Sequence, residues 1–215
     1  MQHTIYIDIE TIPAGPKIDP ATMPHPAIMK KEETIAKWRE EKAPQEAEDL
    51  YRKRALKSME GEIFCICWAI DDGKIRSIWD EKNERVILDM FTDVLGEEID
   101  LRESVIWVGH NCLTFDMAWL WRRAIKYDLT MLANLIRLDK YKGNIEDTML
   151  MWRGADYQDY VSLDNLARYL GLGDSVGSGS EVYDWYLAQE FGAIVDHCKI
   201  DVELTRKIYK KIRGY

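Results

Sequence analysis

Two acidic residues stand out in the segment TIYIDIETIP, residues 4–13, which reads as a β-strand. Side chains alternate between the two faces of a strand, so the isoleucines share one face while Asp8 and Glu10 share the other. A strand so rich in β-branched residues is usually central and covered on both sides, where two carboxylates repel each other and lose hydration. A bound cation would offset both effects. For this pair alone, a surface strand with a solvated face is the favoured interpretation, because 38 of the 215 residues are acidic and such pairs arise by chance.

Two further acids occupy places where catalytic carboxylates are useful. Asp116 falls in the first turn of a predicted helix that follows a buried strand, a place where acids also serve to stabilise helix N-termini. His197 and Asp201 are four residues apart in a predicted C-terminal helix, so they share one face of it. A simple surface interaction between these two residues is the alternative.

The elements that must position these residues follow from the pattern of the whole chain. After the first strand come a proline-rich loop and a charged helical segment, at about 27–60, that is interrupted at Pro44. The remaining predicted elements are a β-hairpin at 61–81, a helix at 84–95, a buried strand at 104–111, and helices at 115–128, 163–170 and 194–213. This order predicts an α/β fold, with a mixed sheet and helices packed on its faces.

The length of 215 residues and a hydrophobic content of 47% suit a single domain, residues 1–215, that buries a real core. The segment at 27–60 is then a helical insertion, either a solvated hairpin or an arm that leans over a site beside the first strand. The net charge of −9 argues against a protein that coats nucleic acid by bulk electrostatics, but not against an enzyme that holds nucleic acid through a cation-filled acidic site.

The compartment is expected to be the cytoplasm. The longest apolar run, residues 63–70, is too short to span a membrane, so no membrane association is expected. The first strand leaves no room for a signal peptide. The four cysteines form no C-x-x-C pair, which disfavours a structural zinc site and suits a reducing environment. Cys198 is expected to be a small buried hydrophobe.

Three motifs together carry a family resemblance that none of them carries alone. They are D-x-E in IDIETIP, N-x-x-x-F-D in VGHNCLTFDMAWLWRRA and H-x-x-x-D in HCKIDVELT, with SLDNLARYLGL between the last two. The set resembles the motifs of the DEDD, or DnaQ-like, 3′–5′ exonucleases. It is most similar to the proofreading domains of family-B DNA polymerases and to related stand-alone predicted exonucleases. The resemblance implies a ribonuclease H-like fold, with a five-stranded mixed sheet flanked by helices.

The resemblance also assigns chemistry to the acids. It implies that Asp8, Glu10, Asp116 and Asp201 hold two Mg²⁺ or Mn²⁺ ions, hard cations that take oxygen ligands and stabilise negative charge during phosphodiester cleavage. His197 is the candidate general base toward the attacking water. At its spacing from the last Asp the polymerase domains have Tyr, so a base, a water-orienting substitute for Tyr and a bystander all stay open.

The implied activity is a metal-dependent 3′–5′ exonuclease that releases nucleoside 5′-monophosphates from single-stranded DNA. By resemblance, Thr11, Ile12, Asn111 and Phe115 contact the terminal nucleotide, although a plain core role is the stronger interpretation of Phe115. Partners in replication or repair are expected. The alternatives are an exoribonuclease with the same chemistry and a catalytically silent nucleic-acid-binding module.

Overall fold

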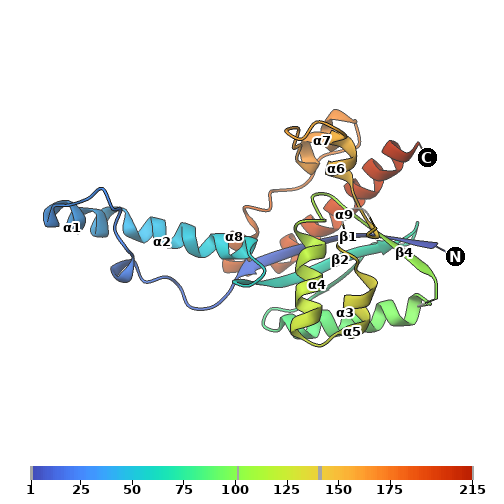
Figure 1. Ribbon diagram of the computed structural model, residues 1–215, viewed down its shortest axis with the longest axis horizontal. Coiled ribbons are helices and arrows are strands. Elements are labelled where there is room, and N and C mark those ends of the chain that lie inside the picture. Colours follow the sequence, from blue (N-terminus) through green and yellow to red (C-terminus); the bar gives the residue numbers. More distant parts are fainter. Residues whose placement is uncertain (1, 101, 140–141, 215) are drawn as a thin grey trace. The chain divides into compact units, whose positions relative to one another are not determined.

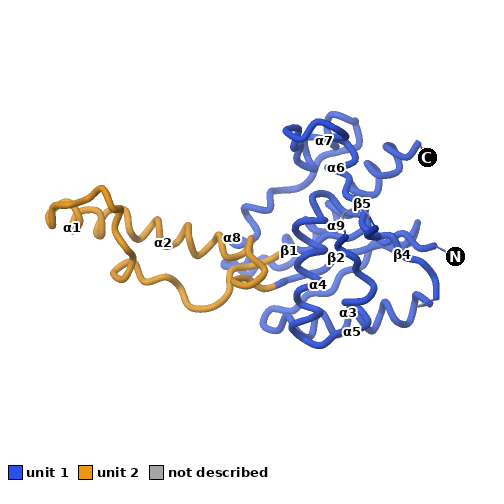
Figure 2. The backbone as a smooth tube through the Cα atoms, in the orientation of Figure 1, with its two compact units in different colours: residues 1–10, 63–215 blue, residues 11–62 orange. Residues whose placement is uncertain are grey.

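The computed structural model describes residues 2–100, 102–139 and 142–214, and its backbone forms two compact units (Figure 2). The larger unit contains the chain up to Glu10 and again from Ile63 onward. The smaller unit is the segment Thr11–Glu62. The smaller unit therefore begins directly after the two acids of the first strand.

The larger unit is built on a five-stranded sheet with the order β3-β2-β1-β4-β5 (Figure 1). The strands are β1 Gln2–Pro13, β2 Gly61–Ile70, β3 Arg76–Trp79, β4 Ser104–Gly109 and β5 Ile145–Asp147. β1 pairs in parallel with β4, and β4 in parallel with β5, whereas β2 and β3 form the antiparallel hairpin predicted around Asp72 and Gly73. The sheet is mixed and flanked by helices, which confirms the predicted ribonuclease H-like α/β fold.

The two faces of β1 pack against different parts of the larger unit, as the alternation of its residues predicted. Ile5, Ile7 and Ile9 enter the main hydrophobic core, which also holds the fully buried Trp107 and Phe91. On the opposite face, Tyr6 makes an edge-to-face contact with Tyr209 of α9, with 5.7 Å between ring centroids. β1 is therefore central in the sheet and covered on both sides, so any acid on it lies in a poorly hydrated place.

Seven helices of the larger unit are described. They are α3 Glu84–Glu98, α4 Asp116–Lys126, α5 Thr130–Leu135, α6 Thr148–Arg153, α7 Leu163–Tyr169, α8 Val182–Leu187 and α9 Phe191–Arg213. The long helices α3, α4 and α9 stand where their periodicity predicted them. α5, α6, α8 and the three-residue strand β5 were not predicted from the residues, because elements this short show no readable hydrophobic period.

The smaller unit is helical, with α1 Glu32–Glu41, α2 Ala43–Arg52 and two 3₁₀ turns, η1 Pro20–Thr22 and η2 Lys53–Leu56. Pro44 lies in the first turn of α2, where its missing N–H has no helical partner to lose, so the predicted interruption falls there. Met23, Trp38, Ala43 and Ala47 form a small core of its own. The segment closes on itself, since the backbone N–H of Ala14 donates to the carbonyl of Glu60 at 3.1 Å.

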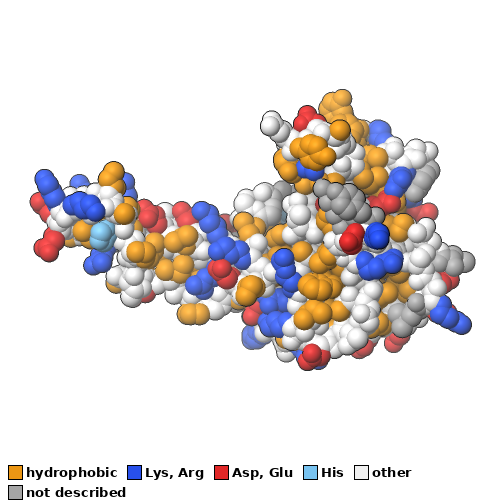
Figure 3. Space-filling view, viewed as in Figure 1, with side chains coloured by type: hydrophobic (Ala, Val, Ile, Leu, Met, Phe, Trp, Pro, Cys, Tyr) orange, Lys and Arg blue, Asp and Glu red, His pale blue; other side chains and the backbone are white. Residues whose placement is uncertain are grey.

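Charge is distributed without a dominant sign on the face drawn in Figure 3, where acidic and basic side chains are interspersed. The basic C-terminal residues make contacts inside the chain: Lys210 pairs with Asp72, Arg213 pairs with Glu146, and Lys211 donates to the carbonyl of Leu170. Within the described part of the chain, no helix is both long and apolar enough to cross a membrane.

Candidate active site

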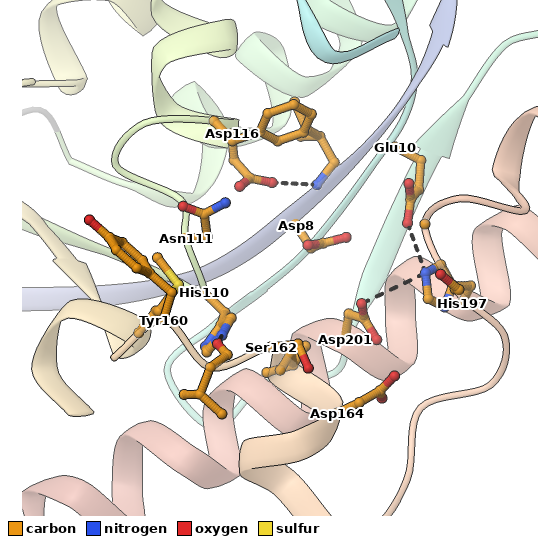
Figure 4. Close-up of a pocket in the computed structure, with 17 residues that line it drawn as sticks. Asp8, Glu10, His110, Asn111, Asp116, Tyr160, Ser162, Asp164, His197 and Asp201 are labelled. Carbon is orange, nitrogen blue, oxygen red and sulfur yellow. Dashed lines mark hydrogen bonds and ion pairs between the residues drawn. The ribbon is translucent and has the colours of Figure 1, made fainter. Parts of the chain in front are cut away.

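Five carboxylates line one cavity of about 460 Å³: Asp164 of α7 and the four acids that the motifs singled out. Asp8 and Glu10 come from β1, Asp116 is the first residue of α4, and Asp201 lies in α9 (Figure 4). Residues separated by nearly two hundred positions in the sequence thus face one space. The structure brings together the four acids that the motifs singled out.

Direct contacts join the elements that carry these acids. The backbone N–H of Ile9 donates to Oδ1 of Asp116 at 3.0 Å, which ties the start of α4 to β1. On the other side, the thiol of Cys198 in α9 donates to the carbonyl of Asp8 at 3.4 Å. The buried Cys198 is thus a small core residue, as predicted, that also holds α9 against the acidic strand.

The loop between β4 and α4 has a backbone that sets the direction of α4. A Cβ at Gly109 would lie 2.4 Å from Cβ of Cys112, so a larger residue would not fit there. Asn111 adopts a positive φ of 57°, a conformation that asparagine tolerates better than most residues. The N–H groups of Asn111 and Leu113 donate to the Asp147 carboxylate at 2.9 and 3.1 Å. Asp147 therefore holds the turn that aims Asp116 into the cavity.

Burial and mutual repulsion make the ionised forms of these acids unfavourable. Burial raises the pKa of Asp8 well above its usual range, and the carboxylates of Asp116, Glu10 and Asp201 raise it further. Burial likewise raises the pKa of Glu10 well above its usual range. Burial raises the pKa of Asp116 to about 7, against the hydrogen bond from Ile9, which lowers it. Burial also raises the pKa of Asp201, although His197 and Ser175 counteract the shift.

His197 is buried beside two of these acids, and its surroundings define which nitrogen carries the proton. Its Nε2 lies 3.4 Å from Glu10 Oε1 and 3.8 Å from Asp201 Oδ2, and its Nδ1 lies 3.3 Å from Oγ of Ser175. The Ser175 hydroxyl donates to Asp201 at 2.7 Å, so its oxygen is left to accept from Nδ1–H of His197. In neutral His197 the lone pair is then on Nε2, which faces the acids.

The donor set fits hard divalent cations. Carboxylate oxygens are the ligands that Mg²⁺ and Mn²⁺ prefer, and a cation would relieve the repulsion that raises the pKa values of these acids. The acids are gathered around the cavity without converging on one point. Among the described residues, the potential ligand atoms that lie mutually within 4.8 Å as a group of three belong only to Cys65, Cys67 and Cys198.

This group of three buried thiols was not visible in the spacing of the cysteines. Cys65 and Cys67 lie on one face of β2, and Cys198 meets them from α9. Three thiols are one short of the four ligands of a structural zinc site. The Cys67 thiol donates to the carbonyl of Val195 at 3.7 Å, so the group also ties β2 to α9.

The predicted substrate-binding residues divide between the two units. Asn111 and Phe115 line the cavity, and the Phe115 ring also packs against Trp119, with 5.9 Å between centroids. Thr11 and Ile12 belong to the smaller unit, where the Thr11 hydroxyl donates to the carbonyl of Ala55 at 2.6 Å. A contact of Thr11 or Ile12 with the terminal nucleotide stays a prediction.

Several residues of the cavity were missed by the sequence reasoning. The clearest is His110, whose Nε2 lies 2.8 Å from the carbonyl of Val161 and whose Nδ1 lies 2.9 Å from the Thr148 hydroxyl. Burial lowers the pKa of His110, and its Nε2–H donates to the carbonyl of Val161. Its position between Gly109 and Asn111 at a strand end was the available signal. Tyr160 and Ser175 had none, because each reaches the site from an irregular loop.

The helix α4 also carries two buried residues behind the site. Arg123 is 5% exposed and its Nε lies 2.7 Å from the buried Glu84, so it is not available to bind phosphate. Trp119 on the same helix is 1% exposed and belongs to the core. Asp164 lies in the first turn of α7, of which Ser162 is the N-cap, and it lines the cavity while accepting from the backbone N–H of Ser175 at 3.1 Å.

The five-stranded mixed sheet and the acids of the three motifs around one cavity agree with the DEDD, or DnaQ-like, 3′–5′ exonuclease superfamily. Residues 62–214 match the family described as "Predicted 3'-5' exonuclease related to the exonuclease domain of PolB". The chain belongs to this family. The match begins after β1, so the assignment of Asp8 and Glu10 to the site rests on the geometry of the structure.

A solved structure supports the fold. The chain is similar to the family B DNA polymerase from the hyperthermophilic archaeon Pyrobaculum calidifontis, with a TM-score of 0.62 and 16% sequence identity over 98% of this chain. The chain spans 24% of that polymerase. No curated protein matches the sequence.

Proposed function

We propose that this protein is a metal-dependent 3′–5′ exonuclease that hydrolyses single-stranded DNA and releases nucleoside 5′-monophosphates. The observation that carries the proposal is the gathering of Asp8, Glu10, Asp116 and Asp201 around one cavity. Their raised pKa values reflect burial and mutual repulsion, which a bound cation would relieve. Proteins with replication or repair functions are the proposed partners.

The four acids would hold two Mg²⁺ or Mn²⁺ ions. Such ions, when bound, stabilise negative charge on the phosphate and on the attacking and leaving oxygens. The chain's own residues supply the remaining functions. Asn111 and Phe115, at the cavity wall, would position the terminal nucleotide. His197 would accept the proton of the attacking water at Nε2, while Ser175 holds Nδ1–H.

The reaction exchanges one P–O bond for another. Water oxygen bonds to the terminal phosphorus, the P–O3′ bond breaks, and the shortened strand keeps a 3′-hydroxyl. The proton from water passes to His197, which later releases it to solvent, and the departing O3′ takes up a proton from solvent. A free 3′-hydroxyl end is regenerated after each step, so the next nucleotide can be removed in the same way.

The substrate is tested with end-labelled single-stranded DNA, duplex DNA and RNA of one sequence, each with Mg²⁺, Mn²⁺ or EDTA. We expect mononucleotides from single-stranded DNA with either metal and none in EDTA. Faster release from RNA would identify the same chemistry as an exoribonuclease. Binding of strands without release in any metal would identify a silent binding module.

A further inference from the structure

A second cavity, of about 230 Å³, adjoins the acid-lined one. Asn111, Met149 and Tyr160 line both, so the two spaces meet at these side chains. Leu113, after β4, and Leu150, in α6, contribute apolar wall to the second cavity. A nucleotide strand whose end lies among the acids therefore has a second recess beside it, whose wall also includes Asp147.

Arg153, the last residue of α6, lines this second cavity. Its Nε is buried and has no hydrogen-bond partner among the described residues. The nearby Asp147 carboxylate is engaged elsewhere, because it accepts from the N–H groups of Asn111, Leu113 and Met149. Buried donors are nearly always paired, so an occupant of the cavity with an acceptor atom would complete the site.

Two exposed tyrosines stand against the same guanidinium. The central carbon of Arg153 lies 5.0 Å from the ring centroid of Tyr160 and 5.3 Å from that of Tyr157. Tyr160 is 65% exposed and Tyr157 is 69% exposed. Aromatic rings next to a strand-binding site are suited to stacking on nucleobases, which all have a flat π-face.

We propose that the second cavity is a nucleobase subsite, which holds one base near the 3′ end of the strand while the acids hold the scissile phosphate. The apolar wall of Leu113, Met149 and Leu150 suits the flat face of a base, and Arg153 Nε donates to a base oxygen or ring nitrogen. A phosphate would place its charge against that apolar wall. This subsite rests on the proposed function, because it assigns part of the same substrate.

Binding of 3′-end oligonucleotides in Ca²⁺, without turnover, tests the subsite separately from catalysis. Arg153→Met keeps an apolar side chain of similar length and should weaken binding of an intact strand by about tenfold. Arg85→Met is the matched control, because Arg85 lies 5.4 Å from the Tyr127 ring centroid but does not line either cavity. Tyr160→Leu provides a second variant at an exposed position. Circular dichroism and thermal unfolding identify any variant that fails to fold.

The strands carry an abasic site at each of the last three positions in turn. We expect the deficit of Arg153→Met to vanish at one of these positions, because the lost base is the group that Arg153 contacts. A deficit that persists at all three, or an equal deficit in Arg85→Met, overturns the subsite. A deficit removed by a neutral methylphosphonate linkage instead shows a phosphate site and also overturns it. Mononucleotide release in Mg²⁺ tests the proposed function by itself, whatever the binding result.

Discussion

At the scale of single residues, His197 and the acids should differ in how much activity each supplies. Loss of a general base typically costs about 10²–10⁴ in rate, and we expect His197→Ala to fall in this range. Asp201→Asn should cost more, because it removes part of the charge that holds the cations. His197→Tyr, which introduces the residue that the family resemblance predicts, should retain substantial activity. Single-turnover release of mononucleotides measures all three, and wild-type turnover in His197→Ala would make His197 a bystander.

Asp116 gives a prediction about stability and pH. Burial raises its pKa from 3.8 to about 7, so the folded state binds more protons than the unfolded state between these values. A group with a raised folded pKa stabilises the fold when protonated, and this contribution is lost as pH rises from about 4 to about 7. We expect the free energy of unfolding in EDTA to fall across this window.

The matched variant for this effect is Asp116→Asn, which keeps the shape and removes the titration. The difference in stability between wild type and variant should change with pH across the window, as measured by urea unfolding at several pH values. Parallel pH profiles for the two proteins would show that Asp116 is ionised without penalty. Exposed acids such as Asp72 affect both proteins equally and cancel in the difference.

The limits of sequence reasoning at this scale follow from the kind of contact involved. The alternation of β1 was enough to place Asp8 and Glu10 on one face, and helical spacing was enough to place His197 beside Asp201. The roles of Ser175, which contacts His197 and Asp201, and of Tyr160, which lines the cavity, could not be predicted, because each comes from a loop whose path depends on tertiary packing. The meeting of the three thiols could not be predicted for the same reason, because Cys198 comes from a helix far along the chain.

At the scale of elements, the long ones were predictable and the short ones were not. α3, α4 and α9 show a clear helical period, and the hairpin of β2 and β3 has an Asp-Gly turn. β5 has three residues, so its place at the sheet edge was implied only by the family resemblance. Its last residue, Asp147, nevertheless holds the β4–α4 turn, so an element too short to predict helps to position Asp116.

A deletion can test the function of the smaller unit, Thr11–Glu62. Its ends are joined by the Ala14–Glu60 hydrogen bond, so residues 15–59 can be replaced by a short glycine linker with little strain. If the segment is an arm that contacts the strand, the deletion should weaken binding of long single strands more than that of a dinucleotide. Equal losses on both ligands, measured by fluorescence anisotropy, would point to a folding role.

At the scale of the whole molecule, cation binding should be coupled to stability. A ligand that binds the folded state at 100 times its Kd adds about 2.7 kcal/mol per site, which is roughly 5–10 °C in Tm for a chain of this size. We expect Mg²⁺ or Mn²⁺ to raise Tm by this order. Asp8→Asn should raise the Tm in EDTA, since it removes one repelling charge, and should reduce the response to metal. Equal metal responses in both proteins would place the ions elsewhere.

The measurement that tests the central claim most directly is the digestion of one DNA sequence in linear and circular single-stranded form, with wild type and Asp201→Asn. The 5′-labelled linear strand shows direction as a ladder that shortens from its 3′ end, and the circle has no end to offer. We expect wild type with Mg²⁺ to degrade the linear strand to mononucleotides and to spare the circle. A 3′-phosphate should block the reaction, and Asp201→Asn should be inactive on both forms. Cutting of the circle, or unchanged degradation in EDTA or by Asp201→Asn, would contradict a metal-dependent exonuclease built on these four acids.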